Sequence, residues 1–217
     1  MRRPISPSLI LIFVLILTFL SFLPCLKSDF VNWDDGAHLL ENQSLRSLDS
    51  EHLSNIFREK INKIYIPLTT LSFALEHKFF GYNSFVYHLD NVLLHLGVVV
   101  LVFLLGRRLG LSGAGAGLAA LFWGIHPIHV ESVAWVTERK DVLYAVFYMA
   151  AVHCWLSYLA GRQKIFYVFS LILGILSMLA KPMAVSLPLI LWVCDWFKGR
   201  KITRSVVIEK VPYLIVL

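Results

Sequence analysis

Chemistry-bearing side chains gather in two segments of this chain, and the first of them ends in a pair of adjacent carboxylates. Asp34 and Asp35 close the segment DFVNWDD, residues 29–35, directly after an apolar run. A positioned carboxylate can take the proton of a hydroxyl group during a transfer reaction. We therefore expect Asp34 or Asp35 to act as a base. An exposed turn is the alternative, because Asn and Asp favour turns and helix caps.

The second segment, HPIHVESVAWVTERKD over residues 126–141, crowds histidines, acids and a pair of cations into one short connection. Arg binds phosphate through two parallel hydrogen bonds, whereas Lys acts as a point charge. We expect Arg139 and Lys140, together with Lys181, to hold a phosphate group. The polar side chains expected to line the same site are His88, Asp90, His126, His129, Glu131, Glu138 and Asp141. A solvated helix cap is the alternative interpretation of residues 138–141.

Histidines also mark the first half of the apolar run near residue 90. His88 and His95 are seven residues apart, so they share one face of a helix. Two interpretations stay open: both are packing groups satisfied by neighbouring helices, or both line the same cavity as the segments above.

The elements that position these groups are long apolar runs. The 217 residues are 58% hydrophobic and 16% charged, with a mean hydropathy of +0.70, whereas soluble domains carry about 25% charged residues. We predict an all-α polytopic membrane protein. Its predicted spans cover residues 7–26, 86–106, 113–126, 142–160, 165–180 and 183–197, and a seventh begins near 206, inside which the chain ends.

The distribution of cations predicts the orientation of these spans. One set of connections holds ten cations: Arg2, Arg3, Arg107, Arg108, Arg162, Lys164, Lys198, Arg200, Lys201 and Arg204. The opposite short connections hold three, Arg139, Lys140 and Lys181. Cytoplasmic loops carry the excess of Lys and Arg, so we place the N-terminus in the cytoplasm and the acidic loops outside it. A cleaved signal peptide is an alternative for the first run, but we favour an uncleaved anchor.

Three regions follow: a first span over 1–26, a first extracytoplasmic loop over 27–85, and a multispan membrane domain over 86–217. A loop of this length is too long for a plain connector. Within it, residues 52–60 and 67–80 resemble amphipathic helices, the second with Leu68, Leu71, Leu75 and Phe79 on one face. Such a helix suits the membrane interface.

The sequence argues against several other classes of site. The net charge of +6 forms no single basic patch, so we expect no nucleic-acid partner. Cys25, Cys154 and Cys194 match neither a metal site nor a disulfide framework. The glycine-rich segment from residue 113 lacks the Lys-Ser/Thr of a phosphate loop, and we interpret Gly113 and Gly117 as a helix-packing face.

Six motifs, in order, carry a resemblance to a known family. They are FVNWDD (30–35), PLTTLSF (67–73), YHLDNVLLH (87–95), HPIHVE (126–131), ERKD (138–141) and KPMAV (181–185). The chain resembles the transmembrane and tetratricopeptide-repeat O-mannosyltransferases and their prokaryotic relatives from about residue 30 to residue 195. These belong to the C-type glycosyltransferases, which share a multispan architecture and an acidic motif in the first outer loop.

This resemblance implies transfer of mannose or a similar sugar from a polyprenyl-phosphate or dolichyl-phosphate donor to Ser or Thr of an acceptor protein. No cofactor besides that donor is certain, and a divalent metal on the second carboxylate is an option. The family tends to carry Arg before the PLT segment, where this chain has Ile66, so Lys63 or Lys78 would have to compensate. The family's C-terminal repeats do not follow within 217 residues, so we interpret the chain as the membrane front end.

Two further functions compete with a transferase. A transporter or flippase of a lipid-linked or anionic substrate would place its charges near the bilayer midplane, and here they gather at one face. A non-catalytic assembly protein would use the outer loops as a docking surface.

Overall fold

Helices dominate the structure, a computed structural model that describes residues 5–215. The chain is 79% helical, with no strand among the described residues. The longer helices are α1 (Pro7–Phe22), α3 (Pro67–Phe80), α4 (Ser84–Arg108), α5 (Gly113–Gly124), α7 (Arg139–Gly161), α8 (Lys164–Ala180) and α9 (Leu187–Phe197). The shorter ones are η1 (Leu23–Lys27), η2 (Gly36–Leu40), η3 (Gln43–Leu45), α2 (Ser50–Ile56), η4 (Pro127–His129), α6 (Val130–Ala134), η5 (Val136–Glu138), η6 (Pro182–Ser186), α10 (Arg204–Ile208) and α11 (Val211–Ile215).

Three helical segments are long and apolar enough to cross a membrane: Pro7–Lys27, Ser84–Arg108 and Val136–Gly161. Shorter apolar helices cover Gly113–Gly124, Lys164–Ala180 and Pro182–Phe197, so a helix lies at each of the first six predicted spans. The 12 residues of α5 reach only about 18 Å at 1.5 Å per residue. The chain is an all-α polytopic membrane protein.

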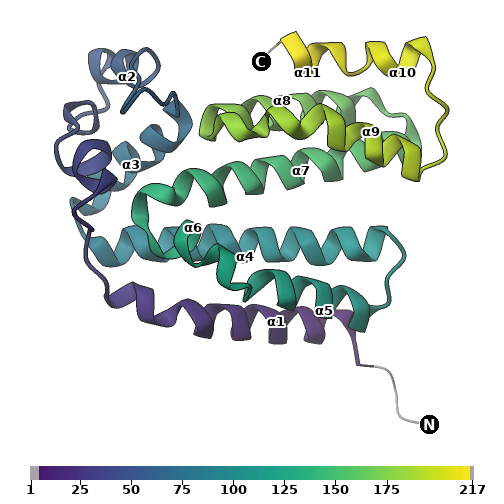
Figure 1. The fold of residues 1–217 in the computed structure, drawn as a ribbon, viewed down its shortest axis with the longest axis horizontal. Helices are drawn as coiled ribbons and strands as arrows, with labels where there is room; N and C mark the ends of the chain where they lie inside the picture. Colours follow the sequence, from purple (N-terminus) through teal and green to yellow (C-terminus); the bar gives the residue numbers. More distant parts are fainter. Residues whose placement is uncertain (1–4, 216–217) are drawn as a thin grey trace.

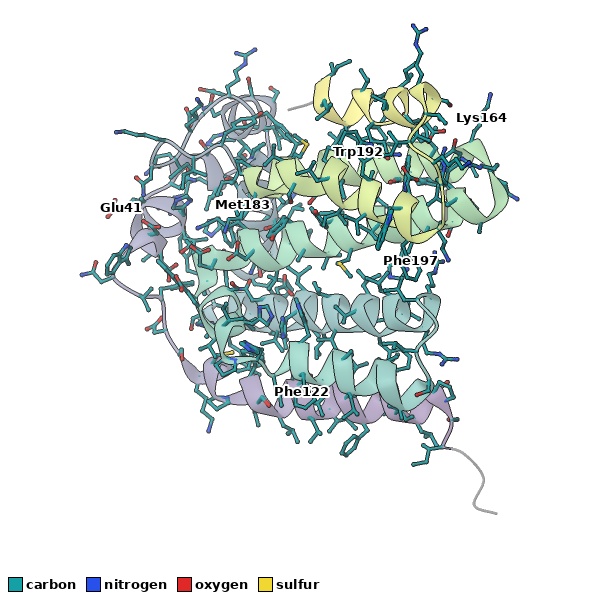
Figure 2. The ribbon with its side chains drawn as sticks, turned by 45° about the vertical axis from the view of Figure 1, so that its right-hand side comes forward. Glu41, Phe122, Lys164, Met183, Trp192 and Phe197 are labelled. Carbon is teal, nitrogen blue, oxygen red and sulfur yellow. The ribbon has the colours of Figure 1, made fainter. Side chains whose placement is uncertain are left out.

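The long helices run side by side, and the connections alternate between the two ends of the bundle (Figure 1). Residues 28–83 form a compact group of short helices at one end, and the connections before α7 and α9 lie at that same end. We call this the loop-bearing end. Figure 2 shows Glu41 and Met183 on its side of the molecule and Lys164 on the other.

Glycines let α5 approach α1 closely, as the sequence predicted for a packing face. A Cβ on Gly117 would collide with the Ile10 side chain, and one on Gly124 would lie 2.7 Å from Thr18 Oγ1. Any larger residue at these two positions would push the helices apart.

The loop-bearing group has a core of its own, built from Leu39, Leu45, Ile56, Phe73 and Tyr87. The helix predicted over 52–60 is shorter and earlier, because Asp49 accepts the N–H groups of Glu51 and His52 and so starts α2 at Ser50. Helix α3 matches residues 67–80 as predicted. Its apolar face divides: Leu71 packs against the core, whereas Leu75 and Phe79 are 43% and 70% exposed.

The end of the chain differs from the single span predicted from residue 206. It forms two short helices, α10 and α11, because the chain turns at Glu209 and Lys210 and Pro212 has no N–H for a continuous helix. Arg2 and Arg3, which entered the count of cations, and the last two residues lie outside the described residues.

Candidate functional site

The two carboxylates of the acidic motif lie in different environments. Asp35 is 1% exposed and accepts three N–H groups, from Val31 (2.9 Å), from the Trp135 indole (3.0 Å) and from the Thr137 backbone (3.2 Å). Asp34 is half-buried and accepts only the Asn62 amide, at 3.3 Å. Asp35 therefore fastens the first loop to the second. Asp34 keeps free lone pairs, and neither carboxylate lines the cavity around Lys181.

The Arg139 guanidinium is fully hydrogen-bonded to other residues of this chain. Its side chain is 1% exposed, forms a two-pronged ion pair with Glu76, and donates Nε to Asn91 at 2.9 Å and Nη2 to the Tyr87 carbonyl at 2.9 Å. The guanidinium also stacks 4.5 Å over the Phe73 ring. In this conformation Arg139 has no face left for a phosphate group.

A chain of polar contacts leads from the acidic motif to Lys181. The Thr137 carbonyl accepts the Lys140 amine at 3.4 Å, and Lys140, only 5% exposed, pairs with Glu138 at 2.6 Å. Lys181 lies 3.8 Å from Glu138 and forms a close ion pair with Asp141. The Ser132 hydroxyl donates to Asp141 at 2.9 Å. Residues far apart in sequence thus meet at the loop-bearing end.

Lys181 and Asp141 line a cavity of about 250 Å³ between the long helices. Both side chains are 23% exposed, so they are the accessible charges of the contact chain. The other lining residues are His95, Trp123, His129, Ser132, Val142, Tyr144, Ala145 and Met183. A cation beside aromatic and histidine rings suits a phosphate joined to a sugar.

An aromatic stack forms one wall of this cavity. The rings of Trp123, His95 and His129 cluster together: the Trp123 centroid is 5.2 Å from that of His95 and 4.2 Å from that of His129, and the two histidine rings are 5.6 Å apart. His95 Nε2 meets the Gly124 carbonyl at 2.8 Å. Burial lowers the pKa of His129, so its ring is neutral at pH 7 and can donate or accept a hydrogen bond.

The remaining predicted lining residues lie elsewhere. His88 is 1% exposed with neither ring nitrogen hydrogen-bonded, and it does not line the cavity. Asp90 is half-buried beside Glu76, and together with burial it raises the pKa of the Glu76 carboxyl, against the effect of Arg139. His126 caps η4 by accepting the Ile128 N–H at 3.2 Å, and Glu131 is exposed. Of the two histidines left open by the sequence, only His95 reaches the cavity.

An apolar groove continues from the cavity along the bundle. Trp123, Tyr144 and Ala145 line both spaces. Beyond them the groove measures about 390 Å³, and its apolar lining is Val98, Val102, Leu105, Met149, Val152 and Ile190, with Tyr148 and Ser186 at its edge. The cavity with Lys181 and Asp141 therefore adjoins a space that suits a hydrocarbon chain.

The sequence analysis did not identify two buried polar residues of the loop-bearing end, His38 and Glu76. His38 is 1% exposed, lies in the π-helix η2 directly after the acidic motif, and has an unpaired Nε2. Such π-helical turns occur often at functional sites. Glu76 is the other, and its signal was the single acid of the 67–80 segment.

Ile66, the departure from the family pattern, is 2% exposed in the core of the loop-bearing group. Lys63 and Lys78 are exposed, and neither lines the cavity with Lys181. Among residues 5–215, no three His, Cys, Asp or Glu side chains come together as a metal-binding group.

The sequence of this chain is similar to those of several known proteins. The chain is 34% identical over 151 residues to protein O-mannosyl-transferase TMTC2 of Mus musculus, covering 65% of the chain and 18% of the relative. It is 29% identical over 189 residues to Tmtc1 of Drosophila melanogaster, covering 82% of the chain and 22% of the relative. For TMTC4 of Homo sapiens the identity is 30% over 190 residues, covering 73% and 25%.

These alignments span between about a fifth and a quarter of the relatives' length. No protein-family model matches the chain, and no solved structure matches it. The similarity runs through most of the helical bundle and is shared by relatives from mouse, human and fly. The chain belongs to the transmembrane and tetratricopeptide-repeat O-mannosyltransferase family.

Proposed function

We propose that this chain provides the donor-binding and catalytic membrane part of a protein O-mannosyltransferase. It would move mannose, or a similar sugar, from a polyprenyl-phosphate or dolichyl-phosphate carrier to Ser or Thr hydroxyls. The names of its relatives support transfer of mannose to proteins. The excess of Lys and Arg at the opposite end supports a cytoplasmic N-terminus and an extracytoplasmic site.

One observation carries the lipid-linked donor: the cavity with Lys181 continues into the apolar groove at Ala145. A nucleotide sugar has no hydrocarbon chain and would leave an apolar groove unfilled. A lipid-linked sugar needs this pairing, because its phosphate requires a cation and its chain requires hydrocarbon surroundings. The geometry favours Lys181 as the cation. Its side chain is 23% exposed, although it pairs with Asp141, whereas Arg139 is 1% exposed and pairs with Glu76.

The transfer is a single displacement that inverts the anomeric carbon. The acceptor hydroxyl loses its proton to the Asp34 carboxylate, and its oxygen forms a bond to the anomeric carbon. The bond from that carbon to the phosphate oxygen breaks, and the lipid phosphate leaves with the electron pair. Lys181 offsets the charge that develops on the phosphate.

Asp35 positions this machinery. Its bonds to Trp135 and Thr137 hold the second loop, from which Glu138 reaches Lys181. A divalent metal would have to bind through Asp34, because Asp35 is buried and already accepts three N–H groups, and the mechanism does not require a metal.

The test uses a bulky side chain to fill the space between the cavity and the groove. Membranes containing the full chain receive radiolabelled polyprenyl-phosphate mannose and a Ser/Thr-rich acceptor peptide. We expect label in the peptide, and we expect Ala145→Trp to reduce it at least tenfold by filling the junction. Ala119→Trp, on the exposed face of α5, is the matched control and should leave labelling unchanged.

Equal labelling in both variants would refute the groove as the donor site. Flux of the labelled lipid across vesicles, with no label in the peptide, would instead establish a flippase. Binding of the labelled lipid with neither transfer nor flux would favour a non-catalytic assembly protein.

A further inference from the structure

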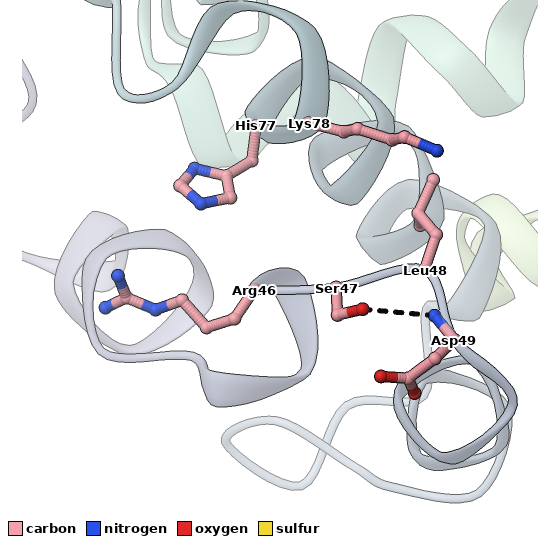
Figure 3. A pocket seen from close by; sticks show the side chains of 6 residues that line it. All are labelled: Arg46, Ser47, Leu48, Asp49, His77 and Lys78. Carbon is pink, nitrogen blue, oxygen red and sulfur yellow. Dashed lines mark hydrogen bonds between the residues drawn. The ribbon is translucent and has the colours of Figure 1, made fainter.

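A second pocket, of about 560 Å³, lies on the loop-bearing group between the last turn of α3 and the segment that enters α2 (Figure 3). Its walls are Arg46, Ser47, Leu48, Asp49, His77 and Lys78. It shares no lining residue with the cavity around Lys181.

Two exposed cations flank this pocket. The Arg46 guanidinium lies 5.4 Å over the Tyr82 ring and donates one Nη to the Leu40 carbonyl at 3.0 Å, which leaves its other N–H groups free. Lys78 forms no ion pair within the described part of the chain. Figure 3 shows Arg46 and His77 extending toward one end of the pocket and Lys78 toward the other.

The remaining polar groups can also receive an anion. His77 has a buried Nδ1 without a hydrogen-bond partner. The Ser47 hydroxyl accepts the Asp49 N–H at 3.2 Å, so its own proton is free to be donated. Asp49, the single acid of the wall, accepts the N–H groups of α2 and contacts the His52 ring at 2.8 Å through Oδ1 alone, so the two cations must outweigh its charge.

Exposed apolar rings place the pocket at the level of a membrane surface. Phe79 and Phe80, next to Lys78, are 70% and 57% exposed, and Phe85 in the first turn of α4 is 47% exposed. The 25 residues of α4 extend about 37 Å, longer than the ~30 Å hydrocarbon core. The first turn of α4, and the pocket near it, therefore lie at the interface.

We propose that this pocket binds the headgroup phosphate of an anionic phospholipid, with Phe79 and Phe80 inserted among the acyl chains beside it. A free phosphate ion explains the cations but leaves the exposed phenylalanines without a role. A bound lipid satisfies both, and it holds the loop-bearing group against the bilayer.

The test uses the full chain purified in detergent and titrated with three short-chain probes. These are dihexanoyl phosphatidylglycerol, dihexanoyl phosphatidylcholine and glycerol phosphate. Calorimetry should detect phosphatidylglycerol binding that falls at least tenfold in an Arg46→Gln/Lys78→Gln variant. The matched control, Arg58→Gln/Lys60→Gln, removes two exposed cations of the same loop that lie outside the pocket, and should bind as the wild type.

Four outcomes would overturn the proposal. Unchanged phosphatidylglycerol affinity in Arg46→Gln/Lys78→Gln removes the pocket from lipid binding. Equal affinity for glycerol phosphate and phosphatidylglycerol makes it a site for the free anion, as does unchanged affinity in Phe79→Ser/Phe80→Ser. Equal affinity for phosphatidylcholine shows that charge is not recognised. Should the double variant fail to fold, Lys78→Gln alone gives the same comparison, because the exposed Lys78 amine makes no hydrogen bond within the described part of the fold.

Discussion

Two ion-pair networks occupy opposite ends of the bundle, and they differ in how completely they are closed. At the end away from the loops, Lys210 and Asp195 pair with only 1% and 4% of their side chains exposed. Arg200 bridges Asp195 and Glu209, and the Tyr158 hydroxyl donates to Glu209 at 3.0 Å. At the loop-bearing end, Lys181 and Asp141 face a cavity.

Unpaired polar atoms show the same contrast. Within residues 5–215, buried side-chain atoms without a hydrogen bond include His38 Nε2, His95 Nδ1 and both nitrogens of His88, all in the half of the bundle near the loops. None belongs to the four charged residues of the closed network. The closed network leaves its charges out of reach of a ligand, whereas the open one borders a cavity.

Replacement of Asp34, the proposed base, should have the largest effect. Asp34→Asn should lower mannose transfer about 10²- to 10⁴-fold, because an amide cannot take the acceptor proton. Folding should be unaffected, since the new side-chain carbonyl still accepts the Asn62 amide. Initial rates at saturating donor and the midpoint of thermal unfolding, measured on the same preparation, check both halves. Full activity in Asp34→Asn would transfer the role of base to Asp35.

Breaking the Arg139–Glu76 pair should have the next largest effect. Arg139→Ala leaves a buried carboxylate unpaired, which costs about 3–5 kcal/mol in the free energy of unfolding. Lys210→Met in the closed network should cost less, because Asp195 keeps its ion pair with Arg200. The double replacement Arg139→Met/Glu76→Leu should recover most of the loss, as measured by denaturant unfolding in detergent. An Arg139→Ala protein with wild-type stability but lost donor affinity would restore Arg139 as a phosphate ligand.

Lys181→Ala tests the open network. Loss of one charge-assisted contact to phosphate costs about 1.5–3 kcal/mol, which is about a ten- to hundredfold rise in the KM for the lipid donor. Arg162→Ala is the matched control, since its side chain is 51% exposed at the opposite end. An equal KM in both variants would exclude Lys181 from donor binding.

The sequence was sufficient for the helices and the family, because apolar runs and ordered motifs are local signals. It also placed Asp34, Asp35, Lys181 and Asp141 at one end of the bundle. It could not show that Arg139 turns inward to Glu76, since that pairing depends on how α3 crosses α7. The sequence also shows that His88 and His95 share one face of a helix. It does not show which neighbouring side chains each of them contacts.

The smallest expected effect is the contribution of His38, at the loop-bearing end, to the pH dependence of stability. Burial and nearby Lys140 lower the pKa of His38 below its ordinary value of 6.5, while Asp34 and Asp35 oppose that change. As the pH falls from 7 through 6.5, the unfolded chain therefore takes up a proton before the folded chain does, and stability decreases. Thermal unfolding between pH 7.5 and 5.5 should show a decline that is smaller in His38→Gln, because the glutamine side chain binds no proton in this range. Glu209→Gln should keep the slope of the wild type, because the pKa of Glu209 is lowered from 4.5 and its carboxylate stays charged throughout. An unchanged slope in His38→Gln would assign the pH dependence to another histidine.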